Sequence, residues 1–133
     1  MLGGAAAYVL FTYLVNDSLT NTAEYDSRIL VAEAVGAFVF AVGWAATVYN
    51  NLDTAKSAFV VGASYALGIL VASVAAVGLL NPAVALGVQS WEWGTCVLGP
   101  ILGGIIGFNL YALLFAPASQ LIKDSASKSS KKK

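Results

Sequence analysis

Three long stretches of the chain are almost entirely apolar. Residues 29–49 carry a single charge, Glu33, and residues 57–78 and 95–117 carry none. A helix needs about 20 residues to cross the hydrocarbon core of a bilayer. Because 59% of the chain is apolar and only 11% is charged, it has too little charge to cover a soluble domain. The sequence therefore predicts an all-α fold, an integral membrane helical bundle.

The remaining segments suggest how this bundle is organised. Residues 1–15 are apolar but too short to cross the bilayer alone, so we interpret them as part of a helix. Residues 119–133 hold five of the seven basic residues and are predicted to be a disordered tail outside the transmembrane domain, residues 1–118. Basic flanks favour the cytoplasm, which predicts a multi-pass protein with a cytoplasmic C-terminus. The lysines are expected to meet the anionic lipid bilayer and not nucleic acid.

Several kinds of chemistry are missing from the sequence. It contains no histidine and a single cysteine, Cys96. This excludes a histidine-based metal site and a Ser-His or Cys-His nucleophile within the chain. There is also no phosphate-binding loop. We therefore expect neither an enzyme nor a protein with a cofactor.

Residues 79–90 are too apolar for a water-exposed loop and too short for a fourth span. They fit a re-entrant segment, which enters the membrane and returns on the same side. Asn81 is a preferred N-cap and Pro82 a preferred first helical residue, which predicts a half-helix from Pro82 to about Gln89. Its positive N-terminal end, deep in the membrane, would repel cations and present hydrogen-bond donors to a cavity. This arrangement suits a pore for a neutral, hydrogen-bonding solute.

Three short motifs resemble the aquaporin, or major intrinsic protein, family. Asn81, Pro82 and Ala83 match its NPA signature. Residues 32–38, AEAVGAF, resemble the AExxGTF opening of its half-repeat, with alanine in place of threonine, and residues 98–104 resemble the GPxxG start of its last helix. The resemblance covers residues 2–117. It implies an aquaporin-like half-repeat, with three transmembrane helices and a re-entrant NPA half-helix, preceded by a partial helix.

The resemblance also implies partners and residue roles. Family pores are built from two inverted halves, so a missing first half or a second chain is needed to close the pore. We expect the chain to be a fragment of a longer protein, and family members are typically homotetramers. Asn81 would bind passing solute, with Pro82 and Ala83 shaping the turn. Glu33 would be a structural support that accepts hydrogen bonds from the backbone of the re-entrant loop.

The positions that correspond to the family's narrow filter depart from its water-selective pattern. They are Ile69, Gly78 and Val84, where Val84 replaces the usual arginine. Losing arginine removes a fixed positive charge and a fork of donors. The sequence therefore predicts a more apolar filter that admits small neutral solutes such as glycerol, ammonia or dissolved gas.

The sequence leaves two functions open. The first is a passive channel for water or small neutral solutes, with solute hydrogen-bonded at the NPA asparagine. The alternative is a non-conducting, truncated channel remnant or membrane scaffold. An ion transporter would need further polar groups at mid-membrane beyond Glu33, and the sequence supplies none.

Small residues are expected to pack the helices closely. Gly99, Gly103 and Gly107 recur every four positions and form one stripe along a helix. Such stripes allow membrane helices to approach each other. Polar side chains within the spans, such as Tyr65 and Asn109, are also assigned to packing.

Overall fold

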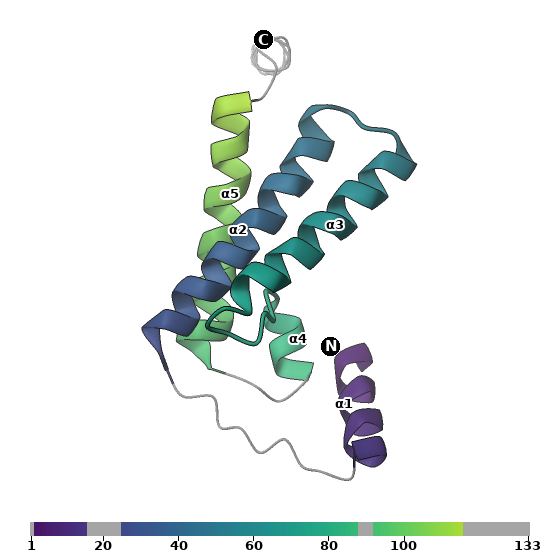
Figure 1. Ribbon diagram of the computed structural model, residues 1–133, viewed down its shortest axis with the longest axis vertical. Helices are drawn as coiled ribbons and strands as arrows, with labels where there is room; N and C mark the ends of the chain where they lie inside the picture. The colour runs from purple at the N-terminus through teal and green to yellow at the C-terminus, as the bar shows by residue number, and fades with distance from the viewer. Residues whose placement is uncertain (1, 16–24, 88–91, 116–133) are drawn as a thin grey trace, which may run out of the picture.

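The computed structural model describes residues 2–15, 25–87 and 92–115, and every regular element in these ranges is a helix (Figure 1). The elements, in chain order, are α1 (Leu2–Val15), α2 (Ser27–Tyr49), α3 (Thr54–Ala72), α4 (Pro82–Gly87), the π-helical turn η1 (Trp93–Leu98) and α5 (Gly99–Phe115). The predicted tail, residues 119–133, and the end of the re-entrant segment, residues 88–90, lie outside the described residues.

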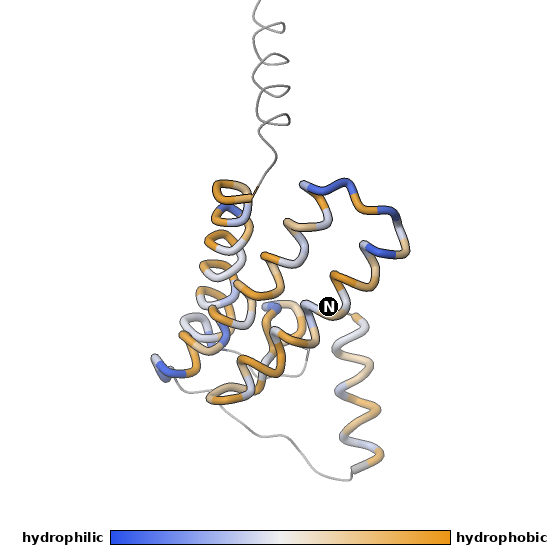
Figure 2. The backbone as a smooth tube through the Cα atoms, turned by 45° about the horizontal axis from the view of Figure 1, so that its top comes forward, coloured by the Kyte–Doolittle hydropathy of each residue, from blue (hydrophilic) through white to orange (hydrophobic). Residues whose placement is uncertain are grey.

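Three of the helices are long and apolar enough to cross a membrane: Ser27–Tyr49, Thr54–Ala72 and the continuous helix Trp93–Phe115. Figure 2 shows apolar colour along their length, with hydrophilic residues gathered where α2 turns into α3. The prediction of an all-α chain with three membrane-length helices is confirmed for the described residues. α2 and α5 run in the same direction, and α3 runs back along α2 on the side away from α5 (Figure 1).

Aspartate side chains cap the N-termini of α2 and α3, just outside the apolar stretches. Asp26 accepts from the backbone N–H of Arg28 at 2.8 Å and pairs with its guanidinium at 3.1 Å. Asp53 accepts from the N–H of Lys56 at 3.0 Å, and α3 therefore begins at Thr54, before the expected residue 57. Hydrogen bonds from the Arg28 and Lys56 side chains lower the pKa of Asp26 and of Asp53, respectively.

A third carboxylate starts the last helix. Glu92 accepts from the backbone and the hydroxyl of Thr95 and caps η1. The backbone N–H groups of Gly94 and Thr95 lower the pKa of Glu92. The π-helical turn that follows runs directly into α5 at Gly99.

The predicted glycine stripe lies against α2. A Cβ built on Gly99 would lie 2.8 Å from the carbonyl oxygen of Leu30, and one built on Gly107 would lie 2.6 Å from that of Phe38. Between them, a Cβ on Gly103 would overlap the carbonyl of Ala34. These contacts repeat every four residues on both helices, so α2 and α5 pack backbone to backbone along a shared row.

Small residues also set the distance between α2 and α3. A Cβ on Gly36 would lie 2.6 Å from the carbonyl oxygen of Gly68, and one on Gly43 would collide with Ser64. At the far end of α2, Asn50 Nδ2 donates to the hydroxyl of Tyr111 on α5 at 2.8 Å. The three long helices are therefore held together by close backbone contacts and by this polar bond.

α1 is attached to the rest of the described chain through α4. Figure 1 shows the two short helices side by side, and a Cβ on Gly87 would lie 2.7 Å from the Cα of Gly4. Most of the other side chains of α1 are exposed, with Leu2 at 90% and Tyr13 at 82%. This apolar helix therefore presents most of its surface to its surroundings.

Candidate functional site: a short helix held inside the bundle

The chain turns back on itself after α3. α3 ends at Ala72, not at the expected residue 78, and residues 73–81 form an irregular loop before α4. Gly78 and Leu80 have positive φ angles of 72° and 50°. The end of α3 and the start of η1 lie at the same end of the bundle (Figure 1). The described part of the segment between them, residues 73–87, leaves the α3 helix and forms an irregular loop followed by the short helix α4.

Glu33 holds this loop. Its Oε1 accepts from the backbone N–H of Leu79 at 2.9 Å, and its Oε2 accepts from that of Leu80 at 2.7 Å. The glutamate is only 1% exposed. Two backbone donors that no helix or sheet satisfies are thus paired with one carboxyl group inside the bundle. These bonds offset the cost of about 1–3 kcal/mol for a non-glycine residue with positive φ at Leu80.

Asn81 begins α4. Its Oδ1 accepts from the backbone N–H of Ala83 at 2.9 Å, and its carbonyl oxygen accepts from Val84 and Ala85 at 3.0 Å. Pro82 is the first helical residue, where its missing N–H costs nothing. No residue of the described ranges accepts a hydrogen bond from Asn81 Nδ2, and the side chain is exposed. The asparagine is therefore both a helix cap and an amide donor open to its surroundings.

A hollow of about 340 Å³ lies beside Asn81. Phe40 and Trp44 of α2 and Tyr65 of α3 form its aromatic wall. The full lining is Phe40, Trp44, Tyr65, Leu80, Asn81, Pro82, Pro100 and Ile101. Phe40 lies just past the middle of α2, whose 23 residues span about 35 Å at 1.5 Å each. Asn81 therefore shares this hollow with Phe40, past the middle of α2, and with Pro100 and Ile101, near the start of α5.

Two of the three filter positions lie side by side, and the third packs beside the residue that follows Gly78. Gly78 and Ile69 are neighbours, since a Cβ on Gly78 would lie 3.0 Å from the Ile69 carbonyl oxygen and 3.1 Å from its Cγ2. Val84 packs against a buried cluster of Leu79, Ala85 and Cys96. Neither Ile69, Gly78 nor Val84 is among the residues that line the hollow at Asn81.

The start of the predicted half-helix is described, and its end is not. α4 has six described residues, Pro82–Gly87, and Gln89 lies outside the described ranges. Its first free N–H, that of Ala83, is already satisfied by Asn81. The polar side-chain group that this segment offers to the hollow is therefore the Asn81 amide.

Sequence reasoning missed the aromatic wall. The sequence assigns Tyr65 to packing, and its ring does contact that of Phe40 edge-on, at 5.3 Å between centroids. It also lines the hollow. The available signal was the spacing of Phe40 and Trp44, which places two large rings on one face of a helix that is otherwise rich in small residues.

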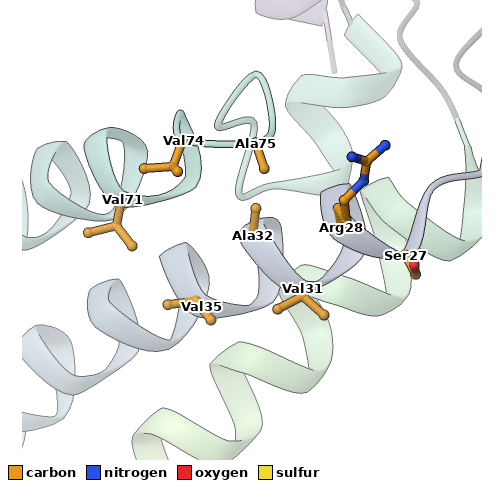
Figure 3. A pocket seen from close by; sticks show the side chains of 8 residues that line it. All are labelled: Ser27, Arg28, Val31, Ala32, Val35, Val71, Val74 and Ala75. Atoms are coloured by element: carbon orange, nitrogen blue, oxygen red, sulfur yellow. The ribbon is translucent and has the colours of Figure 1, made fainter.

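A second hollow, of about 510 Å³, lies where the start of α2 faces the end of α3 (Figure 3). Its lining is Ser27, Arg28, Val31, Ala32, Val35, Val71, Val74 and Ala75. The Arg28 guanidinium is directed away from the valines (Figure 3) and is paired with Asp26. The aliphatic side chains that line this hollow can accommodate a hydrocarbon chain. They offer few hydrogen-bond donors to a polar solute.

Comparison with protein-family models, with curated proteins and with solved structures finds no match to this chain. Within the described ranges, no group of three or more acidic, cysteine or histidine side chains could hold a metal ion. The fold itself defines the class: three helices of membrane length make this a multi-pass membrane protein.

Proposed function

We propose that this chain is one half of an aquaporin-type channel, through which water or small neutral solutes cross the membrane passively. The observation that carries the proposal is the open Asn81 amide, exposed to a hollow between the apolar helices. An unpaired amide inside a membrane is costly unless water or a polar solute reaches it. The motif resemblance around Asn81, Pro82 and Ala83 supports the same function.

The support of the loop by Glu33 fits this proposal. A loop that coordinates solute must keep its backbone in place while solutes pass. The two hydrogen bonds from Leu79 and Leu80 to one buried carboxyl group provide this rigidity. Glu33 faces the loop backbone, so we assign it to positioning the loop and not to transport.

The pore needs more walls than these helices provide. Asn81 and Trp44 are both exposed, and the hollow is open on that side. We propose that a complementary set of helices, from the same polypeptide or from another chain, packs over this face. Lipid would surround the remaining apolar surface, and the tail lysines would place the C-terminus in the cytoplasm.

The same open side favours a second candidate, a membrane scaffold that does not conduct. In that case the exposed face of Asn81 would bind another protein, and the hollow would be filled by its side chains. The two functions differ in one measurable property, which is whether solute crosses a bilayer that contains the chain.

Permeation through proteoliposomes tests the proposal. Two preparations are compared: the chain alone, and the chain joined behind the first half of an established water-selective aquaporin. Light scattering records the volume change of the proteoliposomes after an osmotic step. Proteoliposomes that contain only the first half of the aquaporin are the control. We expect at least one preparation to pass water or glycerol several-fold faster than lipid. Lipid-only rates in both would overturn the channel and favour the scaffold.

A further inference from the structure

We propose that one phospholipid with an ethanolamine headgroup occupies the second hollow, the groove of about 510 Å³ between the start of α2 and the end of α3. An acyl chain lies among the valines, the phosphate binds the Arg28 guanidinium and the ammonium binds the Asp26 carboxylate. This lipid site depends on the chain spanning a membrane and does not depend on the proposed channel.

The groove and the hollow at Asn81 lie on opposite faces of α2. Val31 lines the groove, and Phe40 lines the hollow at Asn81. The positions from Val31 to Phe40 cover about two and a half turns of an α-helix, so the two side chains point in opposite directions. Val31 and Val74 are 56% and 88% exposed. A molecule in the groove is therefore reached from the surrounding bilayer.

Small residues leave the space that the acyl chain fills. Figure 3 shows Ala32 of α2 and Ala75 of the loop after α3 on opposite sides of the groove, with Val31, Val71 and Val74 beside them. An unfilled groove forfeits dispersion contacts along this aliphatic lining. A flexible hydrocarbon chain restores those contacts and requires no hydrogen bonds from the walls.

The groove ends at the level of the lipid headgroups. Ser27, where α2 begins, and Arg28 lie at one end of it (Figure 3). Two aromatic side chains gather at the same end of the bundle: Tyr25 and Trp93 are 62% and 67% exposed, and a Cβ on Gly94 would lie 2.6 Å from the Tyr25 ring. Aromatic residues of this kind favour the boundary between headgroups and hydrocarbon.

The pair of Arg28 and Asp26 complements a headgroup that carries both charges. The Arg28 side chain is 83% exposed. Its Nε and Nη2 donate to Asp26, whereas its Nη1 donates to no group in the described ranges and is available to a phosphate. The Asp26 side chain is 34% exposed, and within the same ranges its Oδ2 accepts one hydrogen bond, which leaves room for an ammonium donor.

This pair favours ethanolamine over other headgroups. Its two charges cancel, so a headgroup with only a negative charge gains phosphate contacts but meets the Asp26 carboxylate. Choline has no N–H and cannot donate to Asp26. An ethanolamine headgroup supplies a phosphate for Arg28 and an N–H donor for Asp26, and it satisfies both.

The chain offers a matched pair that has no groove. At the start of α3, Asp53 caps the helix and pairs with Lys56 at 2.7 Å, and neither residue lines the groove. This pair has the same signs of charge and the same position at a helix start. It therefore controls for any general effect of a capping ion pair on lipid contact.

Photo-crosslinking from the lipid tests the site. The full chain is reconstituted in phosphatidylcholine with a trace of phosphatidylethanolamine that carries a diazirine on one acyl chain, and mass spectrometry locates the crosslinks. We expect crosslinks at residues 31–35 and 71–75. Unlabelled phosphatidylethanolamine should compete for these crosslinks several-fold better than phosphatidylcholine or phosphatidylglycerol.

Charge variants test the headgroup contacts. Arg28→Gln and Asp26→Asn should each lower crosslinking in the groove about five-fold, the upper size for an exposed ionic contact. Asparagine still caps α2, so Asp26→Asn keeps the helix start. Lys56→Gln and Asp53→Asn should leave groove crosslinking unchanged. Crosslinks to the exposed face of α5 serve as the internal reference for correct insertion.

A filled groove tests the acyl-chain contact. Ala75→Phe should abolish crosslinking in the groove, whereas Ala63→Phe on the exposed face of α3 should not. Equal competition by all three lipids, or equal crosslinking in every variant, would show an ordinary lipid annulus and overturn the inference. Disulfide-linked dimers of Val31→Cys in a Cys96→Ala background, in place of lipid crosslinks, would assign the groove to a second copy of the chain and would also overturn it.

Discussion

At the scale of single residues, Glu33 is the side chain on which the local structure most depends. It pairs two backbone N–H groups that the irregular loop leaves without partners. An unsatisfied buried donor costs about 1–3 kcal/mol. One side chain therefore determines whether residues 79 and 80 can remain inside the bundle.

Replacing Glu33 by alanine should destabilise the protein by about 2–5 kcal/mol, because both donors lose their acceptor. Glu33→Gln keeps one acceptor oxygen and should cost less. Tryptophan fluorescence during a denaturing-detergent titration measures the loss, and Val35→Ala on the exposed side of α2 is the control. Unfolding of Glu33→Ala at the same detergent fraction as the control would contradict this role.

The importance of single residues could be predicted only in part. A lone acid in an apolar helix already singled out Glu33, and the Asn-Pro pair indicated a helix start at Asn81. The partners of Glu33 were expected from the family resemblance and not from the residues themselves. The packing of Val84 against Leu79 and Cys96 depends on how α4 lies against η1, which local sequence does not encode.

At the scale of helices, the row of glycines on α5 determines the packing against α2. Gly103 lies in this row, whereas a Cβ added to the neighbouring Gly104 would have no other atom within 4 Å. The two positions are adjacent in sequence and differ only in what they face. They therefore separate the effect of close packing from the effect of glycine itself.

Gly103→Ala should push α5 away from the Ala34 carbonyl and destabilise the bundle by about 1–3 kcal/mol. Gly104→Ala should be neutral or stabilising by up to about 1 kcal/mol, since alanine has the higher helix propensity. Thermal unfolding in detergent, followed by circular dichroism, compares the two. Equal melting temperatures for both variants would show that the row of glycines does not determine the packing of α5 against α2.

The capped N-termini of α2, α3 and η1 should become less stable at acid pH. The folded-state pKa values of Asp26, Asp53 and Glu92 lie below the ordinary 3.8 of aspartate and 4.5 of glutamate. A lowered pKa means that the charged form stabilises the fold, so this stabilisation is complete above the ordinary values. It is lost as pH falls through the folded-state values.

We therefore expect helix content in detergent to be constant from pH 7 down to about pH 5 and to fall below about pH 4 as the caps are protonated. Asp53→Asn should lose part of this pH dependence, because asparagine caps a helix without titrating. Far-UV circular dichroism measures the change. Helix content that rises on acidification would contradict the sign of the argument.

The helices were easier to predict than their ends. Three apolar runs of membrane length indicated α2, α3 and α5 without further information. The end of α3 was misplaced by six residues, because Ser73–Val77 are compatible with a helix, and the contacts of the loop with Glu33 are made by residues distant in sequence. The π-helical turn before Gly99 left no signal in the composition.

At the scale of the whole molecule, large apolar side chains face outward on every long helix. Phe59, Leu70 and Leu113 are 76%, 68% and 80% exposed. In water such a surface would aggregate, whereas in a bilayer lipid covers it. The small residues are inside and the large ones outside, which is the arrangement that membrane helices use to pack closely.

The hollow at Asn81 is open on one side of the described helices. α1 contacts α4 and is otherwise largely uncovered, and Asn81 is exposed. Composition and motif order predicted a helical bundle with a re-entrant segment. They could not predict which side of Asn81 stays open, because this depends on the relative placement of α1, α4 and the three long helices.

The depth of Asn81 in a bilayer is the most direct test of the proposed arrangement. In a Cys96→Ala background, a nitroxide is attached to Asn81→Cys and, as references, to Asp53→Cys at a helix start and Leu67→Cys on the exposed face of α3. Electron paramagnetic resonance with oxygen and a nickel complex as relaxing agents measures the depth of each label. We predict that the label at 81 lies as deep as the one at 67. A label at 81 as shallow as the one at 53 would contradict the arrangement.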